Sequence, residues 1–163
     1  MLAALLLAGP ARADQATALV GLFVQSCLNY AGDPPGLRAW AAQKGLPPVP
    51  EQARKAFLRG APGQVFDASD NEGKFVLISS DDGICAAVTD RVTQVATVAA
   101  LEAGLRAAGI TFRLAIERDD KSIADIHDRE YLATKSGRNW RILLATVKDS
   151  AGGQAMITGA PSF

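Results

Sequence analysis

The chain has 163 residues, with 17 Lys and Arg, 17 Asp and Glu and one His, and 48% of its residues are apolar. High hydrophobicity with balanced charge excludes an intrinsically disordered chain, and the lack of excess basic residues argues against a nucleic-acid-binding protein. No apolar run reaches the roughly 18–20 residues of a membrane-spanning helix. We therefore expect one globular domain.

Residues 1–9 are apolar and uncharged, and they are followed by Pro10 and the tripeptide Ala11-Arg12-Ala13. An apolar stretch, a helix-breaking residue and an A-x-A motif are together typical of a secretory signal peptide. We therefore predict that residues 1–13 are a signal peptide, removed by cleavage before Asp14. The mature protein would then be periplasmic or secreted.

The first third of the predicted domain, residues 14–60, is helical and interrupted by prolines. In its first helix the apolar residues recur at three- and four-residue spacing, and Asp14 is a suitable N-terminal cap. A proline-rich linker over 46–50 separates the two shorter helices that follow. The predicted helices span residues 14–30, 37–44 and 51–58.

From residue 74 onward the apolar pattern changes to that of strands. Turn sequences at 80–83 and 136–139 predict two β-hairpins. A long helix is predicted between them, over residues 92–108, and Gly109 ends it. The predicted strands span residues 75–79, 84–89, 112–117, 131–135, 140–148 and, as a short last strand, 154–158.

Strands joined by tight turns are antiparallel, because the chain reverses its direction at each turn. The pattern therefore predicts an α+β fold: an antiparallel sheet of about five strands, with the N-terminal helices and the long helix packed on one of its faces. Residues 14–163 would form a single domain. Its segment 74–158 would fold as a ββα unit followed by antiparallel strands.

The two cysteines, Cys27 and Cys85, allow one intramolecular pairing. In an exported protein two cysteines in one domain most often form a disulfide. This bond would join the first helix to the sheet and would stabilise the fold by about 4 kcal/mol in the chain-entropy model. The alternative is a reactive thiol partnered by His127, which the oxidising compartment disfavours.

His127 lies in an acidic stretch, two residues after Asp125. If this stretch is extended, the two side chains point the same way, and the carboxylate could raise the imidazole pKa or help to bind a metal. One histidine among scattered carboxylates is a poor transition-metal site, so we predict no metal and no cofactor. A catalytic pair of Asp125 and His127 remains an alternative to the more common polar loop or edge strand.

The acidic segment 67–73 has oxygen ligands but lacks the register of a calcium-binding loop. Counted from Asp67, the sixth position is Glu72 rather than Gly, and the twelfth is not Glu. We interpret this segment, and the acidic pairs at 81–82 and 119–120, as turns. The chain carries none of the common hydrolase or nucleotide-binding motifs.

The second hairpin is the predicted contact surface. Aromatic residues and arginines are enriched at protein interfaces. This hairpin combines both kinds of residue, and core packing of its tryptophan is the alternative interpretation. The candidate contact residues are Tyr131, Arg138, Trp140 and Arg141.

The leader, the amphipathic first helix with Cys27, the hairpin with Cys85 and the ending AMITGAP at 155–161 resemble a sparsely characterised proteobacterial family of small exported proteins, some of them predicted lipoproteins. The resemblance implies export but assigns no activity to any residue. The chain departs from the family in having no cysteine at the end of its leader. We therefore expect a soluble mature protein rather than a lipid-anchored one.

Export, a small disulfide-stabilised domain, near-neutral charge and the absence of a catalytic motif favour a non-enzymatic binding protein of the periplasm. It would be an inhibitor, an immunity-type protein or an accessory of an envelope complex, and its partner another envelope protein rather than nucleic acid or membrane. The alternative is a small envelope hydrolase that uses Asp125 and His127. A structural envelope component without a ligand pocket is a third hypothesis.

Overall fold

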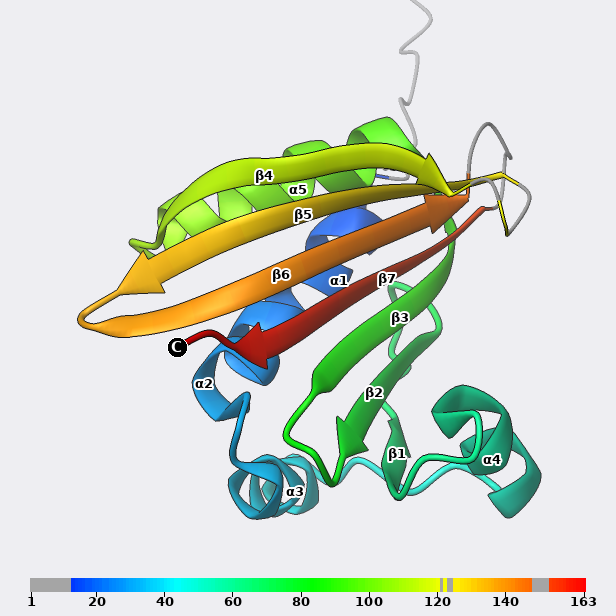
Figure 1. The fold of residues 1–163 in the computed structure, drawn as a ribbon. Coiled ribbons are helices and arrows are strands. Elements are labelled where there is room, and N and C mark those ends of the chain that lie inside the picture. The colour runs from blue at the N-terminus through cyan, green and yellow to red at the C-terminus, as the bar shows by residue number, and fades with distance from the viewer. Residues whose placement is uncertain (1–12, 121, 123–124, 148–152) are drawn as a thin grey trace, which may run out of the picture.

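The structure is a computed structural model that describes residues 13–120, 122, 125–147 and 153–163; residues 1–12 of the predicted leader lie outside this range. Its centre is a seven-stranded antiparallel sheet in the order β1-β2-β3-β7-β6-β5-β4 (Figure 1). The α+β class and the antiparallel sheet are confirmed, but five strands were too few. The strands are β1 (Gly63–Asp67), β2 (Phe75–Ser80), β3 (Cys85–Val92), β4 (Thr111–Asp120), β5 (Ile126–Lys135), β6 (Arg138–Val147) and β7 (Gly153–Pro161).

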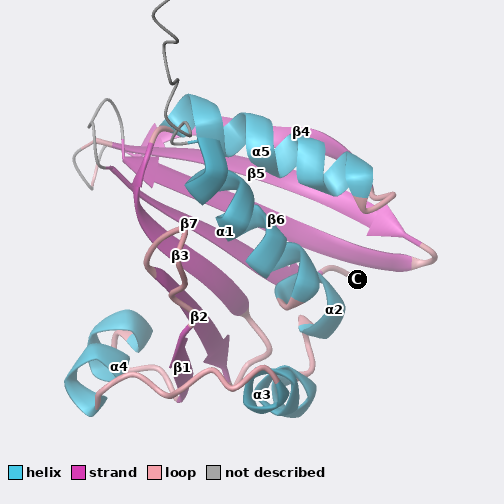
Figure 2. Cartoon of the chain, turned by 180° about the vertical axis from the view of Figure 1, so that it is seen from behind, coloured by secondary structure: helices cyan, strands magenta, loops and turns pink. Residues whose placement is uncertain are grey.

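Helices α1 and α5 lie side by side across one face of the sheet (Figure 2). In α1 the buried side chains Leu19, Val20 and Phe23 follow the helical spacing expected from the sequence. Helix α5 starts two residues later than predicted, because Val92 belongs to β3 and Thr93 caps the helix through the Ala96 N–H. The helices are α1 (Ala13–Gln25), α2 (Cys27–Tyr30), α3 (Pro34–Gln43), α4 (Glu51–Leu58) and α5 (Gln94–Ala107).

The start of α3 differs from the prediction. The sequence places two prolines in a break between helices, whereas the structure begins α3 at Pro34. The side chain of Asp33 caps this helix by accepting a hydrogen bond from the Gly36 N–H at 3.1 Å. Proline is tolerated in a first helical turn because its missing N–H has no partner there.

The expectation that all helices share one face of the sheet is wrong for α4. Leu58 of α4 packs on the opposite face, in a second apolar cluster with Val65, Ile78 and Val88. Strands β2 and β3 carry buried residues in consecutive positions, so both of their faces need cover. Helix α4 covers the second of these faces, where it packs against β1 and β2.

Strand β1 was not predicted, because its five residues contain only one apolar pair, Val65 and Phe66. It forms through pairing rather than through local preference. Along its length it pairs with β2, and on its other side the Val49 N–H donates to the Val65 carbonyl at 3.0 Å. The hydrophobic pattern of a segment does not reveal tertiary contacts of this kind.

Strands β4 and β5 extend further toward their connecting loop than the sequence suggests. Asp119 and Asp120, interpreted as turn residues, are the last residues of β4, where they pair with His127 and Ile126. A bulge between Leu114 and Ile116 shifts the register within this hairpin. This extra length places Asp119, near the end of β4, directly opposite His127 of β5.

Candidate functional site

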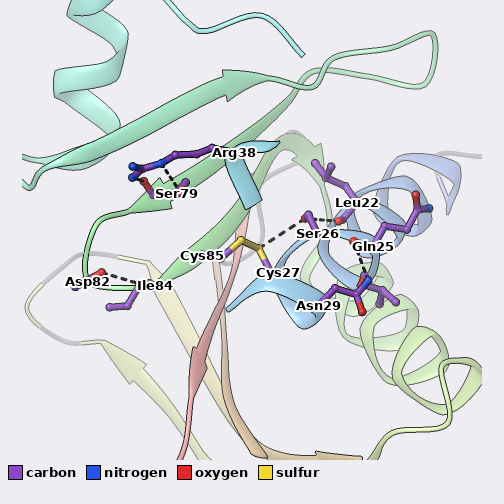
Figure 3. Close-up of a disulfide and its surroundings, with 11 residues drawn as sticks. Leu22, Gln25, Ser26, Cys27, Asn29, Arg38, Ser79, Asp82, Ile84 and Cys85 are labelled. Atoms are coloured by element: carbon purple, nitrogen blue, oxygen red, sulfur yellow. Dashed lines mark hydrogen bonds between the residues drawn. A yellow bond between two sulfur atoms is a disulfide. The ribbon is translucent and has the colours of Figure 1, made fainter. Parts of the chain in front are cut away.

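Cys27 and Cys85 form a disulfide between α2 and β3, with their Cα atoms 5.3 Å apart (Figure 3). Their exposed fractions are 0% and 1%, so the bond lies inside the main apolar core. The predicted disulfide is confirmed. The alternative of a reactive thiol partnered by His127 is wrong, because the bond consumes both thiols.

The turn between β2 and β3 docks closely on the end of α2 and thereby positions the disulfide. The Gly32 N–H donates to the Gly83 carbonyl at 2.9 Å. A Cβ at Gly83 would lie 2.9 Å from the Gly32 Cα, and the φ of Gly83 is +91°, so only glycine fits there. From α3, Arg38 donates to both oxygens of Ser79 (Figure 3), which fixes a further helix to the same hairpin.

His127 is held between two carboxylates of β4. Its Nδ1 lies 2.8 Å from Asp119 Oδ1, and its Nε2 lies 2.9 Å from Glu117 Oε1. The register explains both contacts, since Asp119 is directly opposite His127 and Glu117 points to the same face two residues earlier. Arg129 adds a second cation, 2.7 Å from Glu117 Oε1.

Asp125 does not pair with His127. It lies in a turn with a φ of +67° and is exposed, so the two-residue alternation of β5 does not reach it. We predicted the neighbour along the chain as the partner of His127, whereas its partners lie across the hairpin. The available signal was the alternation of Glu117 and Asp119 before the loop and of His127 and Arg129 after it.

The two carboxylates raise the pKa of His127 above its ordinary value of 6.5, and the contact with Asp119 is the largest cause. The hydrogen bond from His127 lowers the pKa of Glu117 below 4.5. Below this raised pKa the ring is an imidazolium, which can donate from both nitrogens to the two carboxylates. A general base needs a nitrogen with a free lone pair, and neither nitrogen of His127 offers one in this arrangement.

The same cluster connects the sheet to α5. Arg129 Nε donates to the Tyr131 hydroxyl at 2.9 Å, and that hydroxyl donates to Glu102 Oε1 at 3.1 Å. Tyr131 is fully buried, so its hydroxyl requires such partners. The polar residues on this side of β4 and β5 thus form a cross-link between elements rather than an open acid–base site.

We expect the stabilisation by His127 to depend on pH. A raised pKa in the folded state means that the imidazolium contribution is complete below pH 6.5 and is lost as the pH rises through the folded-state value. The variant His127→Gln should therefore lose more unfolding free energy, relative to the natural chain, at pH 6 than at pH 9. Urea unfolding at a series of pH values measures this difference.

Arg141→Gln is the matched control for that series, because Arg141 pairs with Glu130 and with no histidine. The loss of unfolding free energy caused by Arg141→Gln should be the same at pH 6 and pH 9. A His127→Gln cost that also stays constant across this range would contradict the ionic role of His127.

The acidic segment 67–73 is a turn, as interpreted from the sequence. Asp67 accepts a hydrogen bond from the Ser69 N–H at 2.9 Å, and Asp70 accepts one from the Glu72 N–H at 2.8 Å. These bonds occupy the carboxylates with local backbone groups. Among the residues described, no group of three or more His, Cys, Asp or Glu side chains is arranged to hold a metal ion.

The predicted contact residues do not form one surface. Tyr131 and Trp140 have exposed fractions of 0% and 4%, which corrects their assignment as contact residues; Arg138 and Arg141 are exposed. Successive side chains of a strand point to opposite faces of the sheet, which explains why these four residues are separated. Tyr131 and Trp140 face the helices, whereas Arg141 points to the opposite face of the sheet.

Among the described elements, no helix covers the face of β4–β6 opposite α1 and α5 (Figure 1), and on β7 this face continues to Met156 at the edge of the second apolar cluster. We name it the open face. Antiparallel sheets with one solvated face usually carry polar side chains there, but this face has a half-buried apolar strip. The strip consists of Leu132, Leu143, Ala145, Val147 and Met156.

Charged side chains border the strip. Arg141 pairs with Glu130 at 2.8 Å, and Arg118 lies 3.8 Å from Asp128. Arg113, opposite Leu132 in the register, is exposed on the same face. Arg113, Arg118 and Arg141 thus stand against Asp120, Asp128 and Glu130 on β4–β6, and the open face has a charged border with both signs.

No protein-family model matches the chain, and neither a curated protein nor a solved structure is significantly similar to it. No helix within the described ranges is both long and apolar enough to cross a bilayer. The assignment of function therefore depends on the chemistry of the surfaces and side chains themselves.

Proposed function

We propose that this chain is an exported, non-enzymatic binding protein of the bacterial cell envelope, and that its partner is another envelope protein. The observation that carries the proposal is the disulfide between Cys27 and Cys85, buried within the main apolar core. Structural disulfides persist in oxidising compartments and are rare in the cytosol. A core built around such a bond suits a protein that folds after export.

The leader pattern supports the same compartment. Residues 1–13 have the apolar stretch and the A-x-A motif of a signal peptide. Helix α1 begins at Ala13, so cleavage before Asp14 would remove only its first residue. The buried stripe of α1 and the disulfide would both remain in the mature protein.

The open face supports a protein as the partner. Its half-buried apolar strip, with Leu143 near the centre, is bordered by arginines on β4 and β6. Apolar centres with charged borders are typical of protein–protein interfaces, and charge complementarity guides their association. The partner surface would have an apolar centre and a charged border that complements these arginines and carboxylates.

The geometry gives less support to the hydrolase alternative. Asp125 is separated from His127, and both ring nitrogens of His127 are engaged by the carboxylates of Asp119 and Glu117. A hydrolytic mechanism would need one of these nitrogens to take a proton from water or from a nucleophile. The two carboxylates favour the imidazolium form, which has no free lone pair with which to take that proton.

Site-specific photo-crosslinking in cells tests the open face. A photoreactive amino acid at Leu143 should give a discrete adduct with an envelope protein, whereas one at Gln52, exposed on α4, should give none. Adding the substitution Arg141→Glu should remove the adduct, because it reverses the charge at the border. Equal adduct patterns at Leu143 and Gln52, or an adduct unaffected by Arg141→Glu, would contradict the proposal.

A further inference from the structure

A recess lies on the helix side of the sheet, beneath the turn between β5 and β6. The end of α5, the end of α1 and the helix α2 form its other walls, and its volume is about 370 Å³. Small-molecule sites usually occupy clefts of about 300–1,000 Å³, so this recess is large enough to hold a small ligand. We name it the hairpin pocket.

The hairpin pocket has an apolar floor. Val24, Leu28, Ile110 and Trp140 line it, and three of these residues belong to the main apolar core. Among the described residues, no Asp or Glu side chain lines the pocket. The floor therefore suits an apolar group.

Two cations stand at the rim. Lys135 Nζ donates to the Ala108 carbonyl at 2.5 Å, at the end of α5. Arg138 Nη2 donates to the Asn29 carbonyl at 3.2 Å, in α2, and its guanidinium lies 5.2 Å from the centre of the Trp140 ring. These contacts with neutral groups orient both side chains over the same recess.

Neither cation has a carboxylate partner. In the part of the chain that the structure describes, every ion pair within 4.0 Å involves other basic residues, and Lys135 and Arg138 belong to none. The helix-end carbonyls supply only partial negative charge. Both side chains also keep further N–H donors, since Lys has three and Arg has five. Two cations at the rim of one apolar recess are matched by an anion with an apolar body.

We propose that the hairpin pocket binds a carboxylate that carries a short apolar chain. The carboxylate accepts hydrogen bonds from Arg138 and Lys135, and its apolar chain packs on Leu28 and Trp140. The planar guanidinium of arginine fits a carboxylate in a two-point contact. A free fatty acid and the C-terminal residue of a peptide both present this chemistry.

This inference goes beyond the proposed function. The hairpin pocket lies on the side of α1 and α5, whereas the proposed partner surface is the opposite face of the sheet. Ligand binding in the pocket depends neither on export nor on the partner protein, so each proposal can fail while the other holds.

Tryptophan fluorescence and calorimetry test the pocket directly. The oxidised protein with Trp40→Phe leaves Trp140 as the fluorescent reporter at the floor. Octanoate and N-acetyl-leucine are the probes for the fatty-acid and peptide sources, and octanamide is the uncharged analogue of octanoate. Saturable binding of either carboxylate, with at least tenfold weaker binding of octanamide, supports the proposal. Failure of both carboxylates to bind, or equal binding of octanamide, would overturn it.

Matched variants locate the site. Arg138→Gln and Lys135→Gln should each weaken carboxylate binding by about tenfold, since each removes a charge-assisted hydrogen bond. Arg141→Gln, on the open face, should leave the affinity unchanged. Asn29→Trp, which keeps both cations and fills the rim, should abolish binding while thermal unfolding of the protein stays cooperative. Unchanged affinity in Arg138→Gln, Lys135→Gln and Asn29→Trp would refute this site.

Discussion

Replacing both cysteines, Cys27→Ala with Cys85→Ala, should lower the free energy of unfolding by about 4 kcal/mol. The bond connects residues 58 positions apart, so its loss frees a long loop in the unfolded chain. Both side chains are buried, and their loss also loosens the contact between α2 and β3. Because small domains are stable by only about 5–15 kcal/mol, this change should remove a large part of the stability.

Urea unfolding with and without dithiothreitol measures the effect. Reductant should lower the midpoint of the natural chain and leave that of the double alanine variant unchanged. The variant without reductant should resemble the reduced natural chain, apart from the packing lost with two sulfur atoms. A natural chain whose midpoint does not respond to reductant, after alkylation has shown that its thiols are free, would contradict the structural role of the bond.

Gly104→Ala should destabilise the fold by about 1–3 kcal/mol, the usual cost of overpacking a core. Helices α1 and α5 touch at this residue, and a Cβ there would lie 2.4 Å from Val20 Cγ1. Val20 is buried and branched at its Cβ, so it has little freedom to move aside. The whole helix would have to shift instead.

Gly21→Ala is the matched control, because Gly21 is also a helical glycine but has nothing within 4 Å of an added Cβ. Here alanine should stabilise the protein by about 0.4–1 kcal/mol, since it reduces the freedom of the unfolded chain. Chemical denaturation of the two variants should therefore give changes of opposite sign. Changes of the same sign would show that the two helices do not meet at Gly104.

The parts of the fold that follow local patterns could be predicted from the sequence. The buried stripe of the first helix placed Cys27 on its inner side, and the hairpin signal placed Cys85 at the start of a strand. The prediction of the bond itself rested on the leader, because two cysteines in one exported domain most often pair. Helical spacing and tight turns are properties of neighbouring residues, so no tertiary information was needed.

The remaining features depend on contacts across the chain. Strand β1 exists because β2 pairs with it, and α4 covers the second face because β2 and β3 are apolar on both sides. The partners of His127 follow from a strand register that includes a bulge after Leu114. A bulge changes which side chains face each other, and the local sequence does not mark its position. Asp125 was chosen in place of Asp119 because the alternation along the chain put it beside His127, while Asp119 and Asp120 were interpreted as turn residues.

The state of the cysteines in protein recovered from the periplasm tests the proposed function most directly. The full chain with a C-terminal tag is produced in a Gram-negative host, and the cells are separated into periplasmic and cytosolic fractions. The protein from each fraction is alkylated before reduction, and its mass is measured by mass spectrometry. We expect a periplasmic protein that begins at Asp14 and in which Cys27 and Cys85 resist alkylation until they are reduced. A cytosolic protein that retains residues 1–13 and has both thiols alkylated would contradict the proposed function.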